Sequence, residues 1–310
     1  MQTLGKRKGL FTGGCLFLCL MGVSLASAYA DDIKIYSEDV EFAPFETDHV
    51  KLLSVTLLSA TDDRFGGLSG LLKTDAGYIA VSDRGTLFRF DGDSFQKASV
   101  IDLLTSSDVS LSTKRESDAE GLAAGPDGTF YVSFERDHRI VPYRQTGQTA
   151  GEQLALPQNV IALPKNGGLE AIETLRDGRL VLLGEGKKNK PTAPLWVQHG
   201  DKWQAFHLKK RDGFRPTGLT RLPGSDQLIL LERFYQPITG VRVRLSYLDV
   251  QRGTRGVLLA ELGPPMPIDN FEGITAYLDD RGRVVLTLIS DDNFSILQRT
   301  LVTKLLHDPS

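Results

Sequence analysis

Residues 118–136 read DAEGLAAGPDGTFYVSFER, and this stretch decides the fold. A short apolar run opens at Glu120, a Pro-Asp-Gly turn follows, and a β-rich run closes on Glu135. An Asp-Gly turn between two such runs is typical of a β-hairpin. Because the first run begins and the second ends with an acidic residue, the hairpin brings Glu120 and Glu135 to the same edge of a sheet.

Four altered copies of this stretch occur elsewhere in the chain. They begin with GLSGL at 67–71, GLEAI at 168–172, RPTGL at 215–219 and NFEGI at 270–274. Successive first polar positions lie 51, 50, 47 and 55 residues apart; these positions are Ser69, Glu120, Glu170, Thr217 and Glu272. This period is about the length of one four-stranded propeller blade.

The repeat predicts an all-β fold, a β-propeller of five or six four-stranded blades. Residues Val50 to Ala60 precede the first copy and read as a strand without a local partner. We expect them to pair with a C-terminal strand near Arg299 to Leu306, so that the N- and C-terminal strands close the ring and remove an exposed sheet edge. A two-layer sandwich is the alternative, but it does not explain the period.

Residues 1–30 have the features of a cleaved signal peptide. Three cations, at residues 6–8, precede an apolar run from Leu10 to Leu25, and Ala28-Tyr29-Ala30 provides small residues before the expected cut. An uncleaved membrane anchor is the competing interpretation. Both cysteines, Cys15 and Cys19, fall in this segment, so the mature chain from residue 31 has no disulfide. We expect a periplasmic or secreted protein of a Gram-negative bacterium.

The charge balance narrows the range of partners. The formal net charge is −3, and loss of the three signal-peptide cations leaves the mature chain near −6. No basic stripe is present to bind a phosphate backbone, which argues against nucleic acid. No second stretch is apolar enough to cross a membrane, and no dinucleotide or phosphate-loop fingerprint indicates an organic cofactor. We expect a monomer that binds a small anionic or ester substrate.

Carboxylates recur at both ends of the predicted hairpins. Each lies where an inner strand begins or where the next strand ends; they are Glu120, Glu170, Glu272, Asp83, Glu135, Glu185, Glu232 and Asp291. They could simply cap turns. As a set on one face, however, they repel one another unless cations offset them. Hard oxygen ligands favour Ca²⁺, for which we expect Glu120, Glu170, Glu272 and Asp291 as ligands.

Arginines accompany the acidic positions. Four of them, Arg64, Arg84, Arg136 and Arg233, are candidates for substrate binding. The alternative is that they only form ion pairs with nearby carboxylates. A guanidinium can hold a phosphate or carboxylate through paired hydrogen bonds, and a cation can polarise the bond that is cleaved. We therefore assign the catalytic role to the three glutamates together with Asp83.

Five motifs also resemble a known family. They are RFGGLSGL at 64–71, SDRG at 82–85, DAEGL at 118–122, NFEGI at 270–274 and SDDNF at 290–294. The combination resembles the bacterial phytase-like family, described as having esterase-like activity, over nearly the whole mature chain. The resemblance implies a single phytase-like propeller domain over residues 31–310 with phosphoester or ester hydrolase activity. The chain lacks the dense aspartate clusters of calcium-dependent propeller phytases, which argues against phytate itself.

Two other functions fit the same residues. A lactonase-type propeller would hold one divalent ion with Glu120, Glu170, Glu272 and Asn293. A binding module would use the pocket to hold a ligand without chemistry. His138 is the one histidine beside a repeat motif, and we interpret it as a loop residue rather than a general base.

Overall fold

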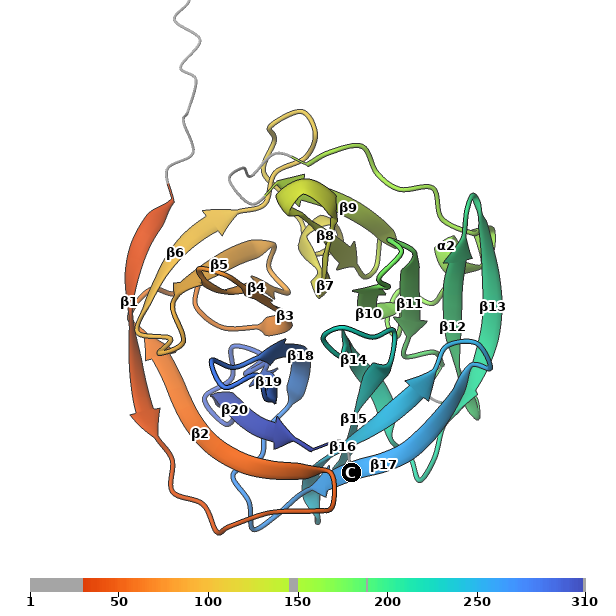
Figure 1. The fold of residues 1–310 in the computed structure, drawn as a ribbon. Coiled ribbons are helices and arrows are strands. Elements are labelled where there is room, and N and C mark those ends of the chain that lie inside the picture. The colour runs from red at the N-terminus through yellow and green to blue at the C-terminus, as the bar shows by residue number, and fades with distance from the viewer. Residues whose placement is uncertain (1–29, 145–149, 188, 309–310) are drawn as a thin grey trace, which may run out of the picture.

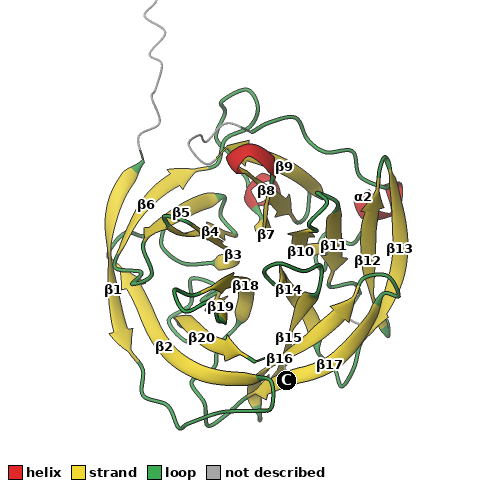
Figure 2. Cartoon of the chain, viewed as in Figure 1, coloured by secondary structure: helices red, strands yellow, loops and turns green. Residues whose placement is uncertain are grey.

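The computed structural model describes residues 30–144, 150–187 and 189–308. Its strands are arranged around a central axis in an all-β, propeller-like fold (Figure 1). Helix is confined to short segments between strands, as Figure 2 shows; these are α1 (Lys114–Ser117), η1 (Pro126–Gly128) and α2 (Gln158–Ile161). The predicted signal peptide and its cleavage site lie almost wholly outside the described residues.

Each of the five repeat copies forms an antiparallel hairpin whose first strand lies nearest the axis (Figure 1). The inner strands are β3 (Leu68–Thr74), β7 (Ala119–Ala124), β10 (Leu169–Thr174), β14 (Arg215–Arg221) and β18 (Phe271–Leu278). Their partners are β4 (Gly77–Ser82), β8 (Thr129–Phe134), β11 (Leu180–Gly184), β15 (Leu228–Gln236) and β19 (Val284–Ser290). The hairpins predicted from the turn residues are confirmed.

The outer strands differ from one copy to the next. The third and fourth hairpins each gain two strands and become four-stranded sheets. The third gains β12 (Thr192–His199) and β13 (Lys202–Lys209), and the fourth gains β16 (Gly240–Asp249) and β17 (Thr254–Leu262). Among the described residues the second hairpin gains only β9 (Arg139–Arg144). The structure therefore does not repeat the expected four-strand pattern in every copy.

The first and fifth hairpins belong to one nine-stranded sheet. The first continues into β5 (Thr86–Asp91) and β6 (Lys97–Asp102), and the fifth into β20 (Thr300–His307) and β2 (Val50–Ala60). The predicted pairing of Val50–Ala60 with the C-terminal strand is present, with Leu58 opposite Thr300. Strand β1 (Asp31–Asp39) then pairs with both β2 and β6 and joins the two halves, which the sequence did not predict.

The inner strands approach one another closely where small residues follow the repeated polar position. A Cβ on Gly218 would lie 2.5 Å from the carbonyl oxygen of Glu272, and one on Gly121 would lie 2.7 Å from the Ser133 hydroxyl. Apolar side chains fill the space between neighbouring sheets, as where Leu231 of β15 and Leu286 of β19 share one core cluster. Burial of this kind supplies most of the stability of a fold built from separate sheets. Within the described ranges no helix has the length and apolarity needed to cross a bilayer.

Candidate metal and anion site

A β-bulge interrupts every inner strand at the repeated polar position. The register with the partner strand shifts between Leu68 and Gly70 in β3, and at the equivalent place in the other four inner strands. The skipped residues are Ser69, Glu120, Glu170, Thr217 and Glu272. A bulged residue is left out of the ladder, and bulges commonly re-aim a side chain beside an active site. All five residues line one narrow cavity on the axis, with a volume of about 10 Å³.

Three of these bulge residues are glutamates that line the same cavity. Burial raises the pKa of Glu120 well above its ordinary value, and the charges of Glu170 and Glu272 raise it further. Burial likewise raises the pKa of Glu170, and the charge of Glu135 makes the largest contribution among its acidic neighbours. No hydrogen bond to the carboxylate of Glu120 or Glu170 occurs within the described part of the chain. Glu120 and Glu170 therefore have no counter-ion among the described residues; together with Glu272 we call them the bulge glutamates.

Glu272 is the bulge glutamate with partial compensation. Its Oε1 accepts a hydrogen bond from Asn270 Nδ2 at 2.9 Å and lies 3.6 Å from the Arg233 guanidinium. Burial still raises the pKa of Glu272, although Arg233 and Asn270 both lower it. Asn270 is 2% exposed, and its Oδ1 has no hydrogen-bond partner among the described residues. A buried carbonyl oxygen beside a carboxylate can serve as a ligand for a cation.

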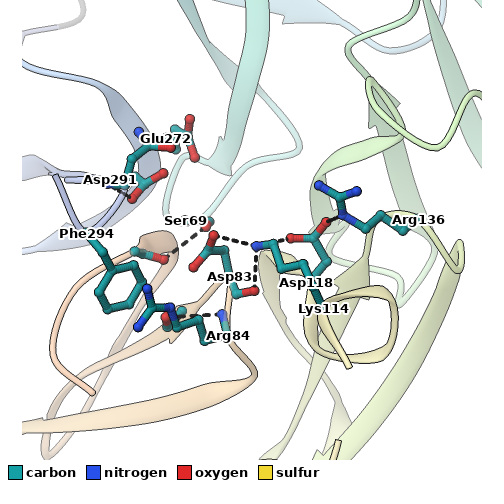
Figure 3. Close-up of polar contacts among 12 residues, drawn as sticks. Ser69, Asp83, Arg84, Lys114, Asp118, Arg136, Glu272, Asp291 and Phe294 are labelled. Atoms are coloured by element: carbon teal, nitrogen blue, oxygen red, sulfur yellow. Dashed lines mark hydrogen bonds and ion pairs between the residues drawn. The ribbon is translucent and has the colours of Figure 1, made fainter. Parts of the chain in front are cut away.

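A second set of acids lies at one end of this channel, which we call the channel mouth. Cationic side chains of the protein neutralise these acids. Lys114 Nζ lies 2.5 Å from Asp83 Oδ2 and 2.5 Å from Asp118 Oδ1, and it also donates to the Asp83 carbonyl at 2.8 Å. Arg136 Nε lies 2.5 Å from the other oxygen of Asp118 (Figure 3). Burial alone would lower the pKa of Lys114, yet its bonds to Asp118 and Asp83 raise it. We call these four residues the Lys114 network.

Carboxylate oxygens of Asp118, Glu120 and Glu135 lie within 4.8 Å of one another, so this triad could hold a metal ion. Two of its members are already engaged, however. Glu135 Oε1 accepts backbone N–H groups from Gly167 at 2.5 Å and Gly168 at 2.9 Å. Both oxygens of Asp118 bind cations of the Lys114 network. Among the described residues, Glu120 thus keeps both carboxylate oxygens free, and Glu135 keeps Oε2 free.

Asp291 closes the fifth-copy side of the mouth. It is 4% exposed, and its Oδ1 accepts the backbone N–H of Asn293 at 2.6 Å. Burial raises the pKa of Asp291 to about 8, with the charges of Glu272 and Asp83 adding to the effect. A carboxyl group that keeps its proton near neutral pH can act as a hydrogen-bond or proton donor.

The structure separates the four predicted substrate-binding arginines. Arg84 lies over the ring of Phe294, 3.3 Å from its centroid (Figure 3), and is exposed. Arg136 and Arg233 lie at the mouth against Asp118 and Glu272, as described above. Arg64 instead forms ion pairs with Asp62 at 2.7 Å and Asp31 at 3.0 Å, near the start of β1. Neither partner lines the channel cavity, and substrate binding by Arg64 stays a prediction.

Sequence reasoning missed Lys114, Asp118 and Asn270 as functional positions. Lys114 falls in the loop between two repeat copies, where the period gives no signal, although its position four residues before Asp118 fits an i,i+4 pair. His138, interpreted as a loop residue, is buried, and its Nε2 lies 3.0 Å from the Pro164 carbonyl.

Comparison with known proteins gives one family. The model for the phytase-like family, described as "Esterase-like activity of phytase", matches residues 63–294. No curated protein matches the sequence.

Solved structures resemble the chain only distantly. A putative gluconolactonase is 12% identical with a TM-score of 0.49, covering 91% of this chain and 93% of that one. An aldose sugar dehydrogenase from Streptomyces coelicolor is 17% identical, with a TM-score of 0.47 and coverage of 81% and 98%. The hydrazine synthase of Kuenenia stuttgartiensis is 11% identical with a TM-score of 0.39; 74% of this chain is covered, and the match spans only 58% of that chain. We draw no functional argument from these similarities.

Proposed function

This chain belongs to the phytase-like family, and we propose that it is an exported propeller hydrolase that cleaves a phosphoester or carboxylic ester at the channel mouth with a bound Ca²⁺ ion. The bulge glutamates carry the proposal, because three carboxylates face one channel without a hydrogen bond to Glu120 or Glu170 among the described residues. The proposal includes five blades, one per repeat copy, a periplasmic or secreted location, and a monomer.

The donor chemistry fits a calcium ion. Glu120, Glu170 and Glu272 would hold it, and the unpartnered Oδ1 of Asn270 adds a neutral oxygen beside them. Asp291, which we predicted as a ligand, lies beside these residues, because Asn270 Nδ2 is 3.5 Å from Asp291 Oδ2. Oxygen ligands of this kind, without cysteine or histidine, are typical of Ca²⁺. When bound, such a cation polarises a phosphoryl or carbonyl oxygen.

The chain's own residues supply the remaining roles. Arg136 and Arg233 bracket the mouth and would orient the other oxygens of the substrate, while exposed Arg84 lies at the rim beside Phe294. Lys114 orients Asp83 through Oδ2, which leaves the buried Oδ1 without a partner. That free oxygen suits a general base that accepts a proton from water. Burial raises the pKa of Asp291 to about 8, and in its protonated form it would serve the leaving group as proton donor instead of acting as a ligand of the ion.

A lactonase is the second candidate, because it would use the same cation site. Of the ligands expected for it, Asn293 contributes its backbone N–H to Asp291, and Asn270 is the asparagine whose side chain reaches Glu272. Hydrolysis of a simple lactone with added Ca²⁺ or Zn²⁺, but of no phosphoester, would favour this candidate. A protein that binds a small molecule tightly and turns over none of these substrates would be a binding module instead.

The test combines metal analysis of the purified protein with hydrolysis of phenyl phosphate and phenyl acetate, with and without chelator. We expect about one Ca²⁺ per chain and turnover that is lost with chelator and restored by Ca²⁺. Glu170→Gln should remove both properties, whereas the exposed Glu152→Gln should change neither. A metal-free protein that is inert on both substrates contradicts the proposal.

A further inference from the structure

A second cavity adjoins the channel mouth between the third and fourth repeat copies. Its volume is about 620 Å³, far larger than the opening between the bulge residues. Cations and aromatic side chains dominate its wall; the residues are Lys190, Lys210, Arg215, Arg233, Phe234 and Tyr235. We call it the basic pocket.

Positive charge is in excess on the wall of the basic pocket. No carboxylate belongs to the lining, although the chain as a whole has a net charge of −3. Arg215 is paired from behind by Glu185 at 2.6 Å, and Arg233 by Glu272 at 3.6 Å. Neither Lys190 nor Lys210 forms an ion pair within the described ranges. The pocket therefore presents net positive charge to whatever enters it.

Two polar groups indicate that the pocket is prepared for an anion. Burial lowers the pKa of Lys210, and the nearby Arg215 lowers it further while Glu185 opposes the effect. Among the described residues Lys210 Nζ makes one hydrogen bond, to the Lys187 carbonyl at 3.1 Å, which leaves donors free. Arg233 Nε is buried and has no hydrogen-bond partner among the described residues. An oxyanion would satisfy such donors with charge-assisted hydrogen bonds.

Arg233 connects the two sites, since it lines the basic pocket and also contacts the bulge glutamate Glu272. A substrate bound at the channel mouth can therefore extend past Arg233 into the basic pocket. Phe234, stacked on Phe214 with ring centroids 5.4 Å apart, gives the pocket a rigid apolar wall beside the cations.

We propose that the basic pocket binds a second anionic group of the substrate, a phosphate or a carboxylate, remote from the bond that is cleaved. The proposal rests on the proposed function for the reaction itself, but not for the binding of an anion. It narrows the substrate class to organic esters or phosphoesters that carry an additional negative charge and an apolar body.

Anion binding is tested first, without turnover. Calorimetric titration with inorganic phosphate, and separately with acetate, should give a dissociation constant that rises about tenfold or more in the Lys190→Met, Lys210→Met double variant, because two charge-assisted bonds are lost. Lys209→Met is the matched control: Lys209 neighbours Lys210, is exposed and does not line the pocket. Equal binding by the double variant and the wild type overturns the proposal. Tighter binding of phosphate than of acetate identifies the preferred group, and the reverse identifies a carboxylate.

The cation site is separated from the pocket by a second variant. Chelator-treated Glu170→Gln protein should bind phosphate as the wild type does, even if no substrate is ever turned over. Loss of phosphate binding in this variant would mean that the anion binds at the channel mouth instead, and would overturn the proposal while leaving the cation site intact.

Substrate preference is tested last, on the wild type and the same variants. The ratio of KM for phenyl phosphate to KM for 4-carboxyphenyl phosphate should exceed 1 in the wild type and fall several-fold in Lys210→Met. The Lys209→Met control should keep the wild-type ratio. A ratio that does not respond to Lys210→Met contradicts the proposed role of the pocket.

Discussion

Two groups of acids lie at the same end of the channel, and the protein treats them differently. Asp83 and Asp118 are held by Lys114 and Arg136 at about salt-bridge contact, 2.5 Å in each case. Glu120 and Glu170 have no such partner among the described residues, and the pKa of each is raised by burial and by neighbouring carboxylates. The first group is complete within the chain, whereas the second requires a proton or a cation from outside.

This difference separates acids that have counter-ions within the chain from acids that lack them, at one end of the channel. A buried carboxylate with a built-in counter-ion stabilises the arrangement of loops around it, and removal of its partner is costly. Buried carboxylates without one lower stability when ionised, and such strain is usual where a ligand binds. The bulges explain why the fold retains this strain, because each bulge directs its side chain to the axis.

Neutralising a bulge glutamate should have the largest effect. Glu170→Gln is expected to lower kcat by about 100-fold or more, since it removes a ligand of the proposed cation and with it the stabilisation of the transition state. The same variant should be at least as stable as the metal-free wild type, because a source of repulsion is gone. Steady-state kinetics and thermal unfolding measure the two effects, and wild-type activity in Glu170→Gln would remove this residue from the site.

Removing the counter-ion of the other group should act on stability instead. Lys114→Met leaves Asp118, which is 2% exposed, with Arg136 alone, and we expect a loss of about 2 kcal/mol in the free energy of unfolding. The value allows for the partial exposure of the lysine itself. Denaturant unfolding measures it, with the exposed Lys202→Met as control. If Lys114→Met is as stable as this control, the Lys114 network does not hold the loops together.

Disturbing the backbone next to a bulge should lower both the stability of the fold and the affinity for Ca²⁺. Gly218→Ala places a Cβ 2.5 Å from the carbonyl oxygen of Glu272, so strands β14 and β18 must separate. We expect a loss of about 1–3 kcal/mol in stability, together with weaker Ca²⁺ binding. Alanine already occupies the equivalent position in β10, as Ala171, and Ala171→Gly should leave β10 and its neighbours in place. Equal effects of the two substitutions would mean that close strand packing does not position Glu272.

The smallest expected effect is on pH dependence. The pKa of Asp291 is about 8 in the folded protein, raised from an ordinary value of 3.8. Between these values the unfolded chain has lost the proton that the folded chain keeps, so the metal-free protein loses stability as pH rises from about 4 to 8. We expect a loss of at least about 1 kcal/mol, or roughly 2–4 °C in Tm, to which the raised pKa values of the bulge glutamates add.

Thermal unfolding at pH 5.5 and pH 8.5 in chelator measures this loss. Ca²⁺ should restore the stability at pH 8.5, and Asp291→Asn should flatten the profile. A metal-free wild type that becomes more stable toward pH 8.5 would contradict the raised pKa.

The repeat allowed much of the fold to be predicted, because hairpin signals are local and recur at a constant distance. The pairing of β2 with β20 followed from the lone strand at Val50–Ala60. The bridging role of β1 did not, since its pairing with β6 depends on contacts between distant residues such as Asp31 and Val100. Residues after the second hairpin that the structure describes form one strand where the period predicted two.

Part of the site could be predicted for the same reason. Glu120, Glu170 and Glu272 occupy the repeated polar position, and the structure brings them together. The bulges themselves were not predictable, because inner strands such as β3 and β14 are buried on both faces and show no alternation that a one-residue shift would interrupt. The ion pairs of Arg64 with Asp62 and Asp31 could not be predicted, because the pair with Asp31 depends on how β1 docks. The repeat gives no information about Lys190 and Lys210, which lie in segments that vary between copies.

A calorimetric titration of chelator-treated protein with Ca²⁺ tests the central claim most directly, when the wild type is compared with Glu170→Gln and Asp118→Asn. We predict that the wild type binds one ion, that Glu170→Gln abolishes binding, and that Asp118→Asn changes affinity by less than about threefold, because Asp118 is already neutralised by Lys114 and Arg136. Binding that survives in Glu170→Gln and disappears in Asp118→Asn would place the ion at the triad of Asp118, Glu120 and Glu135 and contradict this account.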